Sequence, residues 1–256
     1  MNKFLEILAS IPGEVYTSFF MLIITLILCL IIFIKVKHTD PLAKPKGIVH
    51  LAEILVTTID NLVLTNMGKK YLKRGMGGYF TAISIYIFMA FTIGLFGLPT
   101  PMTNLIVPLS LGLFTFIFIH YTSIRATKWR YFKRYVEPFA FFLPVNLISM
   151  WAPLISLSFR LFGNALAGWT VMHLLYWALG MLSDLIFGGF VPLGPSSIFL
   201  TPLVAPMLHL YFDLFGAFIQ TLVFISLSMI FISTEDPEEE ENYQSVNNKK
   251  IIGQVE

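Results

Sequence analysis

The apolar stretch PFAFFLPVNLISMWAPLISLSFRLFGNALAGWTVMHLLYWALGML, from Pro138 to Leu182, decides how this chain folds. Arg160, near its middle, is the only charged side chain in the stretch. At a bilayer centre such a charge costs from roughly 3 kcal/mol on insertion scales to above ~10 kcal/mol in simulations. A chain that keeps an arginine there is expected to use it, or to pair it with a hidden partner.

The composition places the chain among polytopic membrane proteins. It is 56% hydrophobic and 12% charged, and its 25 Phe suit side chains that face lipid and headgroups. The single cysteine, Cys29, allows no internal disulfide and no metal site, and we expect no cofactor. Acidic Glu6 and Glu14 precede the first apolar run, so no cleavable signal peptide is expected.

The apolar runs predict an all-α protein with about five membrane helices and one interfacial amphipathic helix. Between 48 and 67 the apolar residues recur at helical spacing but are interrupted by Glu53, Asp60 and Asn61, which is typical of a helix lying at the interface. The predicted segments are a first span at 18–34, the interfacial helix at 48–74, a hairpin of 79–98 and 105–123, and two long helices at 138–182 and 198–232, within one membrane domain at 1–234.

Basic residues follow the first span, the interfacial helix and the third span. If the interfacial helix does not cross, these clusters share one face, and the positive-inside rule makes that face cytoplasmic and the N-terminus external. The tail, 235–256, begins with six acids around one proline and is expected to be a disordered cytoplasmic end.

The long stretch around Arg160 allows two structures. A single helix of this length extends roughly 65 Å at ~1.5 Å per residue, about twice the ~30 Å hydrocarbon thickness. Length alone therefore favours a two-span hairpin that turns near Arg160. The residues favour a helix, since Ser156, Arg160, Asn164 and Ala167 then share one small, polar face that another helix can approach closely.

The second long stretch carries the only embedded carboxylate, Asp213. On a helix its face includes His209, Gly216, Ala217 and Gln220, a polar line along a strip of small residues. Lines of this kind mark proton or ion paths. Three plainer interpretations compete: an ion pair of Asp213 with Arg160, a solvated His209 at the outer face, and a packing role for a hydrogen-bonded His173.

The segment from Ser156 to Gly168, with its Arg-Leu-Phe-Gly-Asn core, resembles the signature of the subunit a family of F-type rotary ATP synthases. The order of the segments fits that family over nearly the whole chain. The resemblance implies two long, steeply tilted helices against a rotating ring of c subunits, and so a continuous helix through Arg160. It also implies a complex with peripheral-stalk subunit b and, indirectly, a soluble ATPase head, within the lipid of a bacterial inner membrane.

The resemblance also assigns roles to residues. Arg160 matches the arginine that faces the ring's ion-carrying carboxylate and separates two offset half-channels. Gln220 and Asn164 match polar positions near that arginine, and Asp213, with His209 one turn outward, matches an ionisable position of the outer half-channel.

Two departures from the family pattern concern that outer path. Trp169 stands where relatives commonly carry Glu or His, and residues 146–150 lack an acid that many relatives have. His173, one turn beyond Trp169, is the candidate to compensate, and hydrated polar groups are the alternative.

The leading hypothesis is an ion-conducting stator subunit that couples H⁺, or Na⁺, flow to ring rotation and to ATP synthesis or hydrolysis, with no catalytic chemistry of its own. One alternative is an autonomous channel or secondary transporter that uses Arg160 as an anion site. Another is a membrane anchor or assembly protein in which Arg160 pairs with Asp213.

Overall fold

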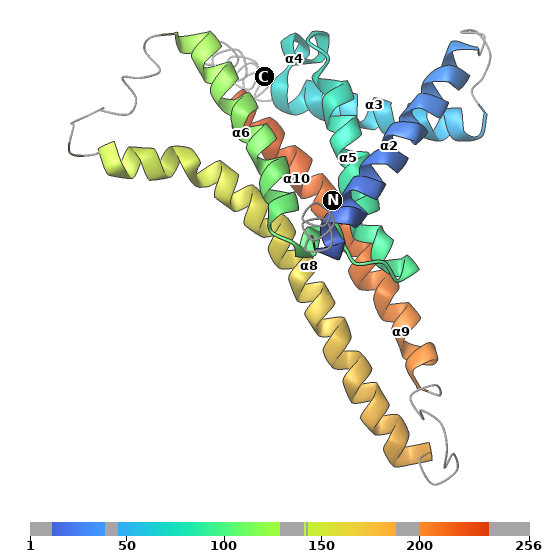
Figure 1. Cartoon of the computed structure of the whole chain (residues 1–256). Coiled ribbons are helices and arrows are strands. Elements are labelled where there is room, and N and C mark those ends of the chain that lie inside the picture. The colour runs from blue at the N-terminus through green and yellow to red at the C-terminus, as the bar shows by residue number, and fades with distance from the viewer. Residues whose placement is uncertain (1–11, 39–45, 129–140, 142, 188–199, 236–256) are drawn as a thin grey trace, which may run out of the picture.

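The computed structural model describes residues 12–38, 46–128, 141, 143–187 and 200–235, and throughout these residues the regular structure is helical (Figure 1). Six helices in this part of the chain are long and apolar enough to cross a membrane. The protein is therefore an all-α polytopic membrane protein, as predicted. Of the tail at 235–256, only Glu235 lies among the described residues.

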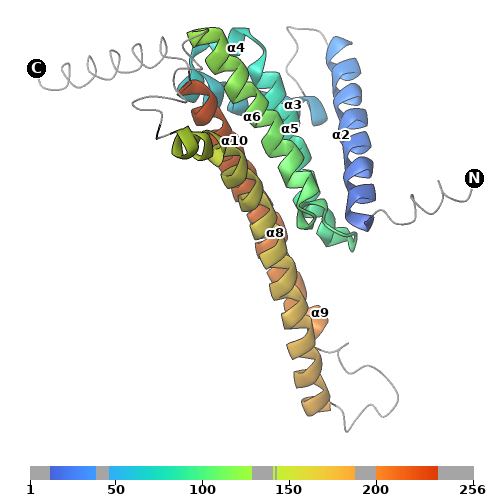
Figure 2. The same ribbon diagram turned by 60° about the vertical axis from the view of Figure 1, so that its left-hand side comes forward.

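The first span and the following hairpin form one side of the molecule. They are α2 (Gly13–Lys37), α5 (Met76–Thr92) and α6 (Ile106–Thr127). The connection between α5 and α6 contains two 3₁₀ turns, η1 (Ile93–Phe96) and η2 (Pro101–Thr103), and the segment between them begins with Gly97 at a φ of 75°. Figure 2 shows α2 alongside α5, with α6 in front of α5.

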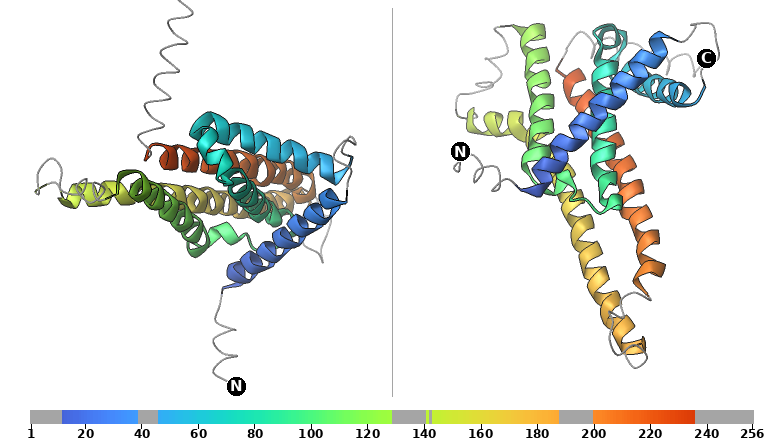
Figure 3. Two further views of the ribbon diagram at one scale, coloured as in Figure 1. Left: turned by 90° about the horizontal axis from the view of Figure 1, so that it is seen from above. Right: turned by 45° about the vertical axis from the view of Figure 1, so that its right-hand side comes forward.

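The predicted interfacial helix at 48–74 is divided into two. The helix α3 (Ile48–Met67) ends at Gly68, whose φ of 84° only glycine adopts readily, and the short α4 (Lys69–Lys73) follows. Figure 1 shows α3 running across α5 rather than along it, and the view from above in Figure 3 shows α3 beside α10. By length and hydropathy alone α3 could also cross a membrane, so its interfacial position stays a prediction.

The stretch around Arg160 is one continuous helix, α8 (Leu143–Phe187), of 45 residues. The hairpin that length alone favoured is therefore wrong, and Arg160 lies inside the helix. Pro153 lies within α8 as well, and a proline there removes one backbone hydrogen bond and allows a bend. In Figures 1 and 2 the later part of α8 extends well beyond the α5–α6 connection.

The last predicted helix contains an irregular segment. It comprises α9 (Thr201–His209), a π-helical segment η5 (Leu210–Phe215) and α10 (Gly216–Ser233). A π segment inserts an extra residue into the helical turn, and such segments are frequent at functional sites. Asp213 lies within η5.

Helices α3, α5 and α10 form the buried core, to which α8 contributes one face. Val63, Phe80, Phe224 and Ile225 are almost completely buried there. In lipid, helices associate mainly through close packing and small residues. The buried apolar residues of α8 recur at intervals of three, four and seven positions and are Leu154, Leu157, Leu161, Ala165 and Met172.

Candidate functional site

A large cavity, about 1050 Å³ in volume, lies between the later half of α8 and the last helices. Its walls come from α8 between Asn164 and Tyr176, from α9 and η5 between Thr201 and Phe215, and from α10 as far as Gln220. The α5–α6 connection, from Gly94 to Thr100, closes another side. We call this space the outer cavity.

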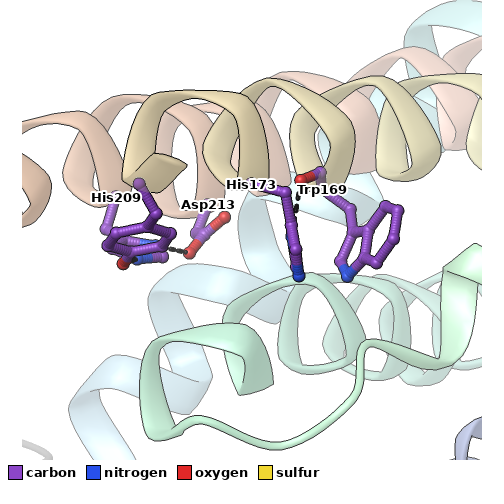
Figure 4. Close-up of polar contacts among 5 residues, drawn as sticks. Trp169, His173, His209 and Asp213 are labelled. Atoms are coloured by element: carbon purple, nitrogen blue, oxygen red, sulfur yellow. Dashed lines mark hydrogen bonds and ion pairs between the residues drawn. The ribbon is translucent and has the colours of Figure 1, made fainter. Parts of the chain in front are cut away.

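Asp213 and His209 form a close pair in the outer cavity. His209 Nδ1 lies 2.5 Å from Asp213 Oδ2, and both side chains are partly exposed, at 26% and 20%. A Cβ added at Gly94 of η1 would lie 3.6 Å from Asp213 Oδ2, so the carboxylate also approaches the α5–α6 connection. Figure 4 shows both side chains on the side of their helix that faces this connection.

Tyr176 of α8 completes a three-membered polar chain. Its Oη lies 2.5 Å from His209 Nε2, so both ring nitrogens of His209 have a hydrogen-bond partner. The contact of Tyr176 with His209 could not be predicted from the sequence, because the two residues lie 33 positions apart along the chain. The sequence does place Tyr176 three residues after His173, on the same helical face, and this spacing alone could have indicated that Tyr176 lies near the site.

His173 is bonded to its own helix rather than to the Asp213 pair. Its Nδ1 lies 3.1 Å from the Trp169 carbonyl oxygen, and the two rings are in contact, tilted by 37° with centroids 4.1 Å apart. Both residues line the outer cavity, and Figure 4 shows both rings on the cavity side of α8. His173 therefore lines the same cavity as Asp213 but makes no hydrogen bond to it within the described chain.

Asn164 and Gln220 join α8 to α10 at the inner end of the outer cavity. Asn164 Nδ2 donates a hydrogen bond to Gln220 Oε1 across 56 positions of sequence. Gln220 is only 3% exposed, and its own Nε2 has no partner among the described residues. An unpaired buried amide of this kind is costly, and it can donate to a group that a partner or a water molecule supplies.

Arg160 lies one turn before Asn164, outside the outer cavity. Its side chain is half-buried, and Nη2 lies 3.5 Å from Ser156 Oγ, a weak contact. In the described part of the chain Arg160 forms no ion pair with Asp213, whose carboxylate is bonded to His209. A guanidinium has five donor hydrogens, so most of the donor capacity of Arg160 is available to another chain.

A second cavity, about 270 Å³ in volume, lies among the first turns of α8 and the last turns of α6 and α10. We call it the inner cavity. This cavity could not be predicted from the sequence, because its walls come from three segments that are distant along the chain. Its polar lining residues are His120, Asn146, Ser149, Thr234 and Glu235.

No group of three or more His, Cys, Asp or Glu side chains within the described ranges comes together to hold a metal ion. The polar residues of both cavities are instead suited to hydrogen bonding with water and to the exchange of protons.

Comparison with known proteins identifies the family. The sequence model of the family described as ATP synthase A chain matches residues 18–233. The chain is 28% identical to "ATP synthase subunit a" of Mycoplasmoides gallisepticum over 93% of this chain and 85% of the relative. It is 30% identical to that of Mycoplasma pneumoniae over 84% and 76%, and 31% identical to the chloroplastic subunit a of Oedogonium cardiacum over 80% and 78%. With these matches over most of its length, the chain belongs to the ATP synthase A chain family.

Proposed function

We propose that this chain is the ion-conducting stator subunit of a rotary ATP synthase. It forms two offset half-channels against a ring of c subunits and couples ion flow to rotation of the ring. The chain itself performs no bond-making step. Its role is to control where a carboxylate on the ring can gain or lose its ion.

The arrangement of the two cavities along α8 carries this proposal. The inner cavity is lined by α8 up to Pro153, and the outer cavity begins at Asn164. Arg160 lies between them and lines neither. On an α-helix it is roughly 10 Å from the first and 6 Å from the second. An ion that enters one cavity would thus have to pass the guanidinium to reach the other.

The charge of Arg160 explains why such a path would not leak. A fixed positive charge repels H⁺ or Na⁺ and favours the ionised form of a nearby carboxylate. A ring carboxylate that passes Arg160 would therefore give up its ion on one side and be reloaded on the other. The weak contact of Arg160 with Ser156 leaves its donors free for that carboxylate.

In the outer cavity, Asp213 and His209 would take up protons. Asn164 and Gln220 would orient Arg160 and border the exit toward the ring. His173 would contribute a second ionisable group to the cavity. H⁺ is the expected ion, and Na⁺ would be selected only by a suitable ring. The partners would be the c-ring, peripheral-stalk subunit b and, through the stalk, the soluble head.

We further propose a bacterial inner membrane as the location, with the N-terminus outside and the C-terminus in the cytoplasm. In Figure 1 the C-terminal ends of α2, α6 and α10 lie on the same side of the molecule as α4. Of these segments α2, α4 and α6 carry basic residues there, such as Lys37, Lys73 and Arg125, whereas α10 carries none. The positive-inside rule supports a cytoplasmic position for that side.

An Arg160→Ala variant in the assembled complex tests the proposal. ATP-driven proton pumping into inverted vesicles should fall to background, because nothing would then separate the two half-channels. Ser156→Ala, which removes only the weak partner of Arg160, is the matched control and should retain most of the activity. Undiminished pumping by the Arg160→Ala complex would overturn the proposal.

The transporter alternative makes a different prediction. An autonomous channel or carrier with Arg160 as its anion site would transport ions when the purified chain alone is placed in liposomes. The stator subunit would not, because its half-channels end at a ring carboxylate. The assembly-protein alternative predicts that exchange of Arg160 and Asp213 preserves function, although Asp213 is bonded to His209 rather than to Arg160.

A further inference from the structure

We propose that Tyr176 is a positioning residue for the ion path, because its hydroxyl bonds to Nε2 of His209 and holds the ring so that Nδ1 faces Asp213. This inference rests on the proposed function, in which Asp213 takes up protons in the outer cavity. It adds a residue from α8 to a pair that otherwise belongs wholly to α9 and η5.

The geometry connects three groups in a line. Tyr176 Oη lies 2.5 Å from His209 Nε2, and His209 Nδ1 lies 2.5 Å from Asp213 Oδ2. The rings of Tyr176 and His209 lie with centroids 5.9 Å apart at an angle of 44°. Both ring nitrogens therefore have one partner each, and the partners come from different helices.

These contacts favour one tautomer of the neutral imidazole. A neutral ring has one N–H and one bare nitrogen, and the hydrogen bond made by one nitrogen determines the state of the other. An ionised Asp213 only accepts hydrogen bonds, so Nδ1 must be the donor toward it. Nε2 is then bare and accepts the Tyr176 O–H. The opposite tautomer would place a nitrogen lone pair against the carboxylate.

The same hydroxyl can also serve a protonated ring. A phenol oxygen accepts as well as donates, so rotation of the O–H allows Tyr176 to accept a bond from Nε2–H. Tyr176 thus keeps a hydrogen bond to His209 in both charge states and holds the ring in place while its charge changes. Few other side chains could do this, since lysine only donates and an ionised carboxylate only accepts.

The surroundings contain few competing groups. From α8, His173 faces the same cavity but is bonded to the Trp169 carbonyl. From η5, Tyr211 faces it with its ring stacked on Phe215. The α5–α6 connection between 94 and 100 has no titratable side chain. Asp213 and Tyr176 are therefore the only described groups that bond to the His209 ring.

The test uses the whole complex in inverted vesicles and a double-mutant cycle. Tyr176→Phe keeps the ring and removes the hydroxyl, and it should slow ATP-driven proton pumping about five-fold, which corresponds to one hydrogen bond. His209→Gln gives Asp213 a donor that has no tautomers. Adding Tyr176→Phe to His209→Gln should therefore cause no further loss.

Tyr211→Phe is the matched control, because it makes the same substitution in the same cavity at a hydroxyl that forms no hydrogen bond within the described chain. It should pump like the natural complex. The amount of assembled complex in each membrane, measured by immunoblot, corrects for variants that fold poorly. Tyr176→Leu, which removes the ring too, shows whether packing alone matters.

Three outcomes would overturn the inference: full activity in Tyr176→Phe, an equal loss in Tyr211→Phe, or the same five-fold loss with and without His209. Activity lost only in Tyr176→Leu would likewise assign Tyr176 to packing. All of these leave the proposed function intact if Arg160→Ala still abolishes pumping. Pumping by the Arg160→Ala complex would instead refute the proposed function itself.

Discussion

Asn164 of α8 donates a hydrogen bond to Gln220 of α10 one turn beyond Arg160, and this contact joins the two long helices where the outer cavity ends. Because Gln220 is buried, the loss of either partner leaves polar atoms unsatisfied in a place that water cannot easily reach.

The first prediction concerns this pair. Asn164→Ala should destabilise the packing of α8 against α10 by about 1–3 kcal/mol and slow proton pumping several-fold, because Gln220 would lose its only hydrogen-bond partner in the described chain. The double variant Asn164→Gln with Gln220→Asn keeps the two amides and the total side-chain length, and it should recover much of the activity. Proton pumping by vesicles measures the loss in the single variant and the recovery in the double variant. Equal activity of the single and double variants would contradict the prediction.

The second prediction concerns the carboxylate of the outer cavity. Asp213→Asn keeps the shape of the side chain but cannot take up a proton, so pumping should fall by at least ~10-fold. Asp184→Asn, also in a long helix but outside both cavities, is the matched control and should have little effect. A mild loss in Asp213→Asn would mean that His173 or water alone supplies the outer path.

The third prediction uses the departure from the family pattern at Trp169. The indole lines the outer cavity and contacts the His173 ring, so a carboxylate placed there would face the same space as Asp213. Trp169→Glu should be tolerated, since Trp169 is 52% exposed. Added to Asp213→Asn, it should restore a measurable part of the pumping, whereas Trp169→Gln should not. No rescue by Glu would show that position 169 does not share a proton path with Asp213.

A fourth prediction is that the two cavities open to opposite sides of the membrane. With the exposed Cys29 replaced by Ser, cysteines can be placed at Ser149 of the inner cavity and at Ala167 of the outer cavity. A membrane-impermeant thiol reagent should label Ser149→Cys in inverted vesicles and Ala167→Cys in right-side-out vesicles. Labelling of both from one side would contradict the offset arrangement.

The fifth prediction concerns the contact of α6 with α8. A Cβ at Gly112 would overlap Ser158 Oγ and would lie 3.3 Å from the Leu154 carbonyl oxygen. The hydroxyl can rotate away, but the backbone carbonyl cannot. Gly112→Ala should therefore push the helices apart at a cost of about 1–3 kcal/mol, measured as a lower Tm of the chain in detergent. Gly78→Ala, where a Cβ meets nothing within 4 Å, is the control.

Much of the fold could be predicted because it depends on local properties. Hydropathy and side-chain spacing predicted the segments around 18–34, 79–98 and 105–123, and the structure has helices at each, with ends a few residues away. The break at Gly68 was not predicted. The sequence shows where the glycines are, but the packing of the surrounding segments determines which of them adopts a positive φ. Length favoured a hairpin at Arg160, and the structure has a continuous helix there instead. The length argument failed because it assumes a helix that crosses the bilayer without tilt.

The sequence by itself determined that this is a helical membrane protein whose embedded charges are Arg160 and Asp213, because the cost of a charge in an apolar run can be recognised one residue at a time. It also determined which residues share a helical face, since that follows from 3.6 residues per turn. Only the tertiary structure decided that Asn164 meets Gln220, that Tyr176 meets His209, and that separate cavities lie on either side of Arg160. These relations join segments far apart in the chain, and they depend on how helices pack and on the π segment that presents Asp213.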